Sequence, residues 1–140
     1  MLIALGLLAA LALAAACGGG EEGGPGGGEL PEGFPRDFPL YEKATVDVAT
    51  VAPEGSGFLV TMKTEDSRDQ VRAFYERALA EDPWQVQNVD VVEVPEEGDE
   101  VVVIKFARVG DGGEWGTVAI STVRENGQHA AIAISLTTSP

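Results

Sequence analysis

The feature that most constrains the fold is a single amphipathic helical segment among segments with strand-like alternation. Between Ser67 and Glu81, apolar residues recur at the spacing of one helix face: Val71, Phe74, Tyr75, Ala78 and Leu79. Ser67 followed by Gln70 is typical of a capping box, and Pro83 is expected to end the helix. This is the one convincing helix in the sequence, so only one helix is expected to cover an apolar sheet face.

Segments on both sides of this helix alternate with the period of two that half-buried β-strands show. Two segments precede the helix and are expected to form a hairpin: Ala44–Val51 and Phe58–Lys63. Four segments follow it: Trp84–Val94, Glu100–Val109, Trp115–Arg124 and Ala130–Leu136. The order ββαββββ predicts an α+β domain of two layers, with the helix packed on the Val, Ile and Phe face of a mainly antiparallel sheet.

The charge and the cysteine content exclude several classes of function. The 140 residues include 23 acidic and nine basic side chains, which give a formal charge of −14. Nucleic-acid binding needs a basic patch, so no nucleic-acid partner is expected. Cys17 is the only cysteine, so the hydrophobic core has to stabilise the fold without a disulfide.

The N-terminal segment differs in composition from the rest of the chain. Residues 1–16 (MLIALGLLAALALAAA) are uncharged and apolar, and Cys17 separates them from a Gly-rich segment. This apolar run suits the hydrophobic region of a signal peptide and is shorter than the roughly 20 residues of a membrane-spanning helix. Gly18–Gly28 contains eight glycines and is expected to be a flexible tether.

The residues Ala14, Ala15, Ala16 and Cys17 resemble the lipobox of bacterial type II signal peptides, whose usual form is Leu, two small residues and Cys. Ala14 takes the place of that Leu, and no Lys or Arg precedes the apolar run. The resemblance implies cleavage between Ala16 and Cys17 and a diacylglyceryl anchor on Cys17. It predicts a lipoprotein on the extracytoplasmic side of the cell membrane or outer envelope. An uncleaved N-terminal anchor with an incidental cysteine is the alternative.

We therefore expect a signal peptide at 1–16, a lipidated cysteine and tether at 17–33, and one globular domain at 34–140. Leu30–Tyr41 (LPEGFPRDFPLY) is rich in proline and aromatic residues, which predicts an irregular lead-in packed along the domain. With AFYERAL at Ala73–Leu79 and with Trp84, it resembles small single-domain bacterial lipoproteins of unknown function. This resemblance supports the expected fold and implies no activity.

Few residues are candidates for chemistry. His129 is the only histidine and has no partner in a recognisable catalytic motif, so the sequence predicts no enzyme. The acidic turn Pro95–Glu100 lacks the spacing of a calcium loop, so we expect no metal and no cofactor. Trp84 and Trp115 are candidates to line a ligand pocket, with packing at the edge of the core as the alternative.

The last two predicted strands carry small, uncharged residues on the face opposite their Val, Ile and Leu side chains. These residues are Thr117, Ala119, Ser121, Ala131, Ala133 and Ser135. A sheet face exposed to water usually carries longer polar side chains, so this face is a candidate for contact with a partner. A cover formed by the Pro-rich lead-in is the alternative.

The leading functional hypothesis is a lipid-anchored extracytoplasmic module that binds or scaffolds an envelope protein without catalysis. The alternative hypothesis is an envelope protein that binds a small ligand in a pocket between the helix and the sheet. A third hypothesis, an enzyme, would need a cleft that brings His129 close to a carboxylate.

Overall fold

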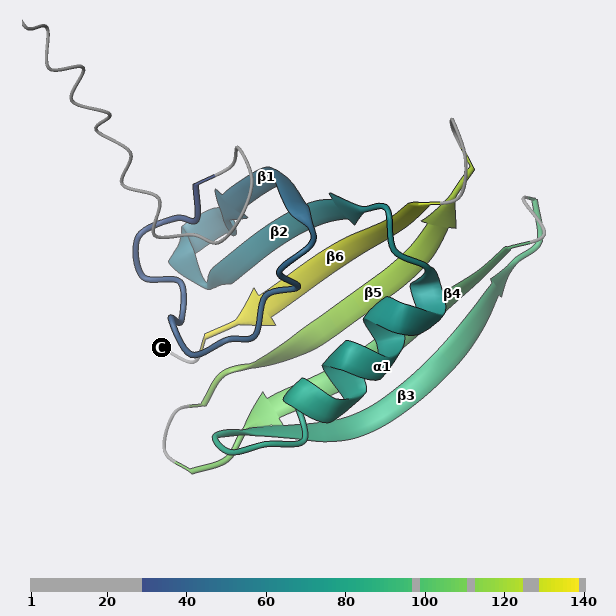
Figure 1. Cartoon of the computed structure of the whole chain (residues 1–140). Coiled ribbons are helices and arrows are strands. Elements are labelled where there is room, and N and C mark those ends of the chain that lie inside the picture. Colours follow the sequence, from purple (N-terminus) through teal and green to yellow (C-terminus); the bar gives the residue numbers. More distant parts are fainter. Residues whose placement is uncertain (1–28, 97–98, 111–112, 125–128, 139–140) are drawn as a thin grey trace, which may run out of the picture.

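Six strands form one antiparallel sheet in the order β1-β2-β6-β5-β4-β3 (Figure 1). The computed structural model describes residues 29–96, 99–110, 113–124 and 129–138. The predicted signal peptide, Cys17 and the glycines of the tether lie outside the described residues. The strands are β1 (Thr45–Val51), β2 (Gly57–Thr64), β3 (Trp84–Val94), β4 (Asp99–Arg108), β5 (Trp115–Val123) and β6 (His129–Thr137).

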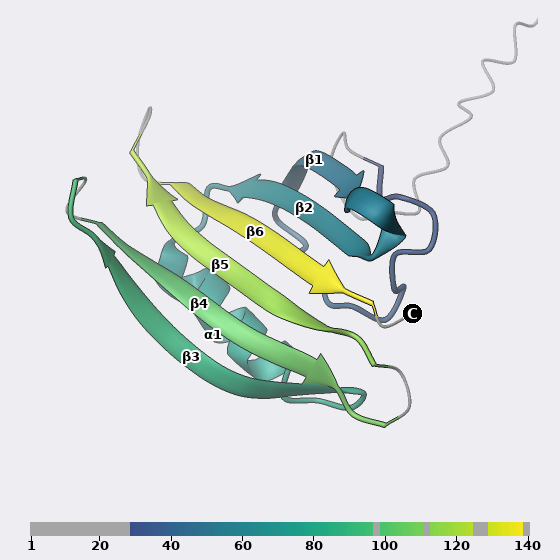
Figure 2. The same ribbon diagram turned by 180° about the vertical axis from the view of Figure 1, so that it is seen from behind.

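Strand register places the apolar residues of alternate positions on one face, which we call the core face. Val60 pairs with Ile134, Ile134 with Val118, and Val118 with Ile104. All four of these side chains are 0% exposed. The opposite face, which we call the open face, has no described element lying over it (Figure 2).

The helix α1 (Arg68–Ala78) lies on the core face and begins where the sequence predicts. The backbone N–H of Ser67 donates to Gln70 Oε1 at 2.9 Å, and the Gln70 N–H donates to Ser67 Oγ at 3.2 Å. This capping box is confirmed, whereas the helix ends at Ala78 rather than at Glu81. Val71, Tyr75 and Leu79 are each 0% exposed, and the helix packs against β4, β5 and β6.

The Pro-rich lead-in covers the part of the core face that α1 does not reach. The Phe34 ring lies 5.5 Å from the Phe58 ring of β2. The Phe38 ring lies 5.3 Å from Trp84 and 5.1 Å from Phe106. Edge-on and tilted contacts of this kind stabilise aromatic clusters beyond the area that they bury. The lead-in is therefore part of the domain core.

Arg108 fixes the lead-in to the sheet through three groups. Its Nη1 and Nη2 atoms donate to the Asp37 carboxylate at 2.6 and 2.8 Å, and its Nε donates to the Glu114 carboxylate. Its guanidinium lies 4.4 Å from the centre of the Trp84 ring, and Trp84 Nε1 donates to the Asp37 carbonyl oxygen at 3.1 Å. The hydrogen bonds and charge of Arg108 hold the pKa of Asp37 below its ordinary value.

This architecture corrects the predicted fold class. The order ββαββββ is right apart from a short 3₁₀ helix, η1 (Pro53–Gly55), which lies between β1 and β2. The two-layer α+β description is wrong, because the domain is mostly sheet and its one α-helix of 11 residues packs on three of the six strands. The predicted irregular lead-in covers the rest of the core face. Its proline and aromatic content indicated that it packs on the domain, but hydrophobic periodicity does not show which face it covers.

Replacing Phe38 with Ala should destabilise the whole domain. Phe38 is 4% exposed and lies between Trp84 and Phe106, so its removal is expected to lower the unfolding free energy by about 3–5 kcal/mol. Urea denaturation of the full chain measures this change, with Glu42→Ala at an exposed neighbouring position as the control. A loss below about 1 kcal/mol would show that the lead-in is not part of the core.

Asp37→Asn should remove a pH-dependent part of the stability. The folded pKa of Asp37 is lowered, so its contribution is present above the unfolded pKa of about 3.9 and is lost as the pH falls through the folded pKa. The stability difference between the native chain and Asp37→Asn should therefore be largest near neutral pH and shrink below about pH 4. Denaturation curves over this range test it, with Glu32→Gln as the control for removing one surface charge. A difference that stays constant with pH would contradict the role of this ion pair.

Candidate functional site

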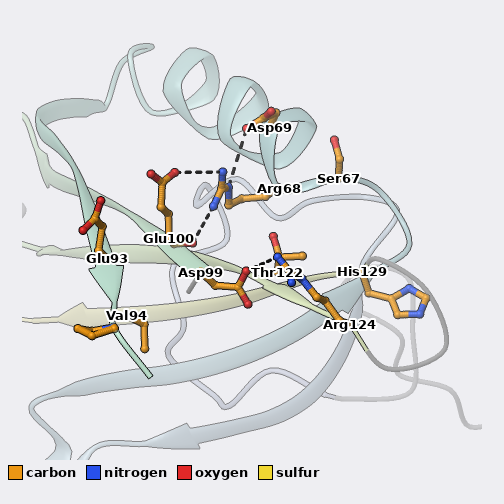
Figure 3. Close-up of a pocket in the computed structure, with 11 residues that line it drawn as sticks. Ser67, Arg68, Asp69, Glu93, Val94, Asp99, Glu100, Thr122, Arg124 and His129 are labelled. Carbon is orange, nitrogen blue, oxygen red and sulfur yellow. Dashed lines mark hydrogen bonds and ion pairs between the residues drawn. The ribbon is translucent and has the colours of Figure 1, made fainter. Parts of the chain in front are cut away.

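An open cleft of about 550 Å³ lies where α1 begins, between the helix and the ends of four strands (Figure 3). Ligand pockets in proteins usually have volumes of about 300–1,000 Å³, so this cleft has the size of a small-molecule site. Its lining is mostly polar or charged: Ser67, Arg68, Asp69, Glu93, Val94, Pro95, Asp99, Glu100, Thr122, Arg124 and His129.

Arg68 connects the start of α1 to β4 across the wall of the cleft. Its Nη1 donates to the Glu100 carbonyl oxygen at 2.8 Å, and its Nη2 lies 3.5 Å from Glu100 Oε2. Its Nε is buried, lies 3.9 Å from Asp69 Oδ1, and has no hydrogen-bond partner among the described residues. The guanidinium is thus held in place by Glu100, and its buried Nε–H has no acceptor among the described residues.

Arg124 provides a second positive charge at the end of β5. Its Nη2 donates to Asp99 Oδ1 at 2.6 Å, and its side chain remains 63% exposed. A guanidinium has five N–H donors, so this ion pair leaves donors free for a ligand in the cleft.

Glu93 provides an exposed negative charge on the strand opposite Glu100. The register of β3 and β4 places these two carboxylates directly across from each other, an arrangement that is destabilising for like charges. Arg68 offsets the charge of Glu100, whereas Glu93 has no ion pair within the described ranges. Figure 3 shows Glu93 at one side of the cleft and the half-buried His129 at the other.

A second hollow of about 590 Å³ lies beside β1 and β2 and also includes His129. Asp66, which lines it, accepts a hydrogen bond from the Tyr41 hydroxyl and lies 3.8 Å from Lys43 Nζ through its Oδ2 atom. Burial and the Asp66 charge raise the pKa of Tyr41 to about 12. Tyr41 therefore stays protonated near neutral pH and ties the lead-in to the chain just before α1.

The structure separates the two tryptophans that were candidates for one pocket. Trp84 is 2% exposed on the core face, where it packs beneath the lead-in. Trp115 is 54% exposed on the open face, opposite Ala107 of β4. Two side chains on opposite faces of one sheet cannot line a common pocket.

The small residues of β5 and β6 are brought together on the open face. Ala119 pairs with Ala133, and Ser121 pairs with Ala131. The lead-in contacts the core face instead, so the alternative in which it covers these residues is wrong.

Among the described residues, no group of three or more His, Cys, Asp or Glu side chains gathers that could hold a metal ion. Glu97 of the acidic turn lies outside these residues. No helix in these ranges is both long and apolar enough to cross a membrane.

Sequence reasoning missed the cleft, although one local signal pointed to it. A positive charge in the first turn of a helix is disfavoured by the helix dipole, and Arg68 is the first residue of α1. Its placement is explained by Glu100, which lies 32 residues further along the chain. The pairing of Glu93 with Glu100 becomes visible only once the strand register is known.

Comparison with known families identifies the type of domain. The sequence model of the START domain-like family matches residues 45–131, which is more than half of the chain. Domains of this family typically bind ligands. No curated protein matches the chain. The match runs from the start of β1 into β6 and includes every residue that lines the cleft at the start of α1. The chain therefore belongs to the START domain-like family.

Proposed function

We propose that this protein binds a small polar ligand in the cleft at the start of α1 and is held outside the cytoplasm by a lipid on Cys17. The main observation is that a chain of the START domain-like family has a ligand-sized cleft whose lining residues all lie within the matched region. The sequence contains no recognisable catalytic motif, so the proposal is binding without turnover.

The charges in the cleft define the chemistry of the proposed ligand. Glu93 presents an exposed carboxylate without an ion pair in the described part of the chain, while Arg124 presents a guanidinium that is 63% exposed. Charge-assisted hydrogen bonds are the stronger kind. A ligand with both an ammonium and a carboxylate would contact both groups, as in an amino acid or a short peptide.

The space between α1 and the sheet is less suited to a ligand than the cleft at the start of α1. The helix fills it with Val71, Tyr75 and Leu79, each 0% exposed, against a strand face that is equally buried. An apolar ligand placed there would have to displace these side chains, whereas the cleft at the start of α1 is already open.

The lipid anchor rests on the sequence at Cys17. The uncharged run before it and the Gly-rich segment after it resemble those of an exported lipoprotein. Two acyl chains provide stable membrane attachment at about 0.8 kcal/mol for each buried CH₂. The acidic charge of the chain gives no attraction to anionic headgroups, so attachment would depend on these chains.

Intact-mass analysis of the protein extracted from membranes tests the anchor. The expected product begins at Cys17 and carries a diacylglyceryl group, because cleavage follows lipidation. The variant Cys17→Ser should retain residues 1–16 and carry no lipid. A native chain that retains Met1 with an unmodified cysteine would refute the proposal.

Titration calorimetry of the full chain in detergent tests ligand binding. Glycylglycine, which carries both charges, is expected to bind, whereas putrescine and succinate carry one sign each and should bind more weakly. Glu93→Gln and Arg124→Gln should each weaken glycylglycine binding by about tenfold or more, the loss of one charge-assisted contact. Lys105→Gln, on the open face, is the matched control and should leave the affinity unchanged. Equal affinity in the native chain, Glu93→Gln and Arg124→Gln would contradict the proposed site.

A further inference from the structure

We propose that two copies of this protein associate through their open faces, with the two sheets packed against each other. The open face carries large apolar side chains that water would otherwise surround. Val48, Leu59, Val92 and Trp115 are 50, 44, 49 and 54% exposed, and strand pairing places them all on this face. These four side chains lie on different strands, β1, β2, β3 and β5, so the face combines exposed apolar side chains with the small residues that lie between them.

The centre of the open face is built for close approach. One row across the sheet runs from Thr61 through Ala133 and Ala119 to Val103. These side chains are short and uncharged, so a second sheet could pack at or below the usual spacing of about 10 Å. The larger side chains surround this row.

Charge on the open face favours a second copy over a charged partner. The chain has a formal charge of −14, which makes most pairs of surfaces repel each other. The open face carries Lys63, whose Nζ lies 3.6 Å from Asp47 Oδ2, together with Lys105 and Asp90. These charges balance, so two open faces meet without the repulsion that the rest of the surface would produce.

The area of the open face is sufficient for a weak dimer. Six strands at about 4.8 Å spacing and about seven residues of shared length give roughly 600 Å² of face for each copy. The pair would bury about 1,200 Å², which is at the lower limit for specific interfaces. The fraction of protein in the dimer should therefore rise with protein concentration.

Among the stretches outside the described residues, only residues 1–16 are rich in apolar side chains. The short stretches 97–98, 111–112, 125–128 and 139–140 contain no Val, Ile, Leu, Met or aromatic residue, and neither does Gly18–Gly28. The cleavage proposed above would remove residues 1–16, and this step of the inference rests on that proposed function. A second copy supplies a matching apolar surface.

Cross-linking in membranes from cells that express the full chain tests this dimer. Ala119→Cys places a thiol at the centre of the open face, and Ala73→Cys places one at an exposed position of α1 as the matched control. A short bis-maleimide should join the first variant into a dimer and should leave the second, and the native chain, monomeric. Adding Leu59→Arg, at an exposed position, should reduce cross-linking of Ala119→Cys by about tenfold without changing the melting temperature.

Cross-linking of Ala119→Cys that is no stronger than that of Ala73→Cys would overturn the proposal. Quenching of Trp115 fluorescence by brominated phosphatidylcholine vesicles would then assign the open face to the membrane, with Trp115→Phe as the control. Glycylglycine affinity is measured separately and should be unchanged by Leu59→Arg. Failure of the dimer and failure of the ligand site can therefore be distinguished.

Discussion

The structure depends on how one short helix and a six-stranded sheet share a core. Eleven residues make a helix about 16 Å long and about 10 Å wide, whereas the strand axes span about 24 Å. The helix reaches three strands, and Phe34, Phe38 and Tyr41 of the lead-in supply the remaining cover. Arg108 holds this cover in place through Asp37 and the Trp84 ring. The same lead-in would connect the domain to the proposed membrane anchor. The segment that follows the tether is therefore also part of the core.

The limited reach of the helix also produces the cleft. Because α1 starts at the edge of the sheet where β3 ends and β4 begins, the strand ends are left open around its first turn. Arg68 enters this space against the helix dipole and is compensated by Glu100. Glu93, Arg124 and His129 remain available around it. The proposed ligand site therefore lies at the end of the core rather than inside it.

The sequence predicted the local elements well and the spatial arrangement less well. Ser67 and Gln70 predicted the helix start because a capping box is encoded within four residues. Alternation predicted the six strands, because each strand buries the side chains of only one of its two faces. The cleft could not be predicted, because Glu93, Glu100 and Arg68 meet through strand register and a long-range contact. The separation of Trp84 and Trp115 onto opposite faces and the contact of the lead-in with the core face likewise depend on tertiary structure.

We propose that this START domain-like protein binds a small charged ligand at the start of α1. The most direct measurement is a titration of the isotope-labelled full chain with glycylglycine, followed through the backbone amide resonances. Binding in the cleft should give saturable shifts concentrated at Arg68, Glu93, Arg124 and His129, with the amides of the lead-in and the open face unchanged. An absence of shifts, or shifts centred on the open face around Ala119 and Ala133, would contradict it.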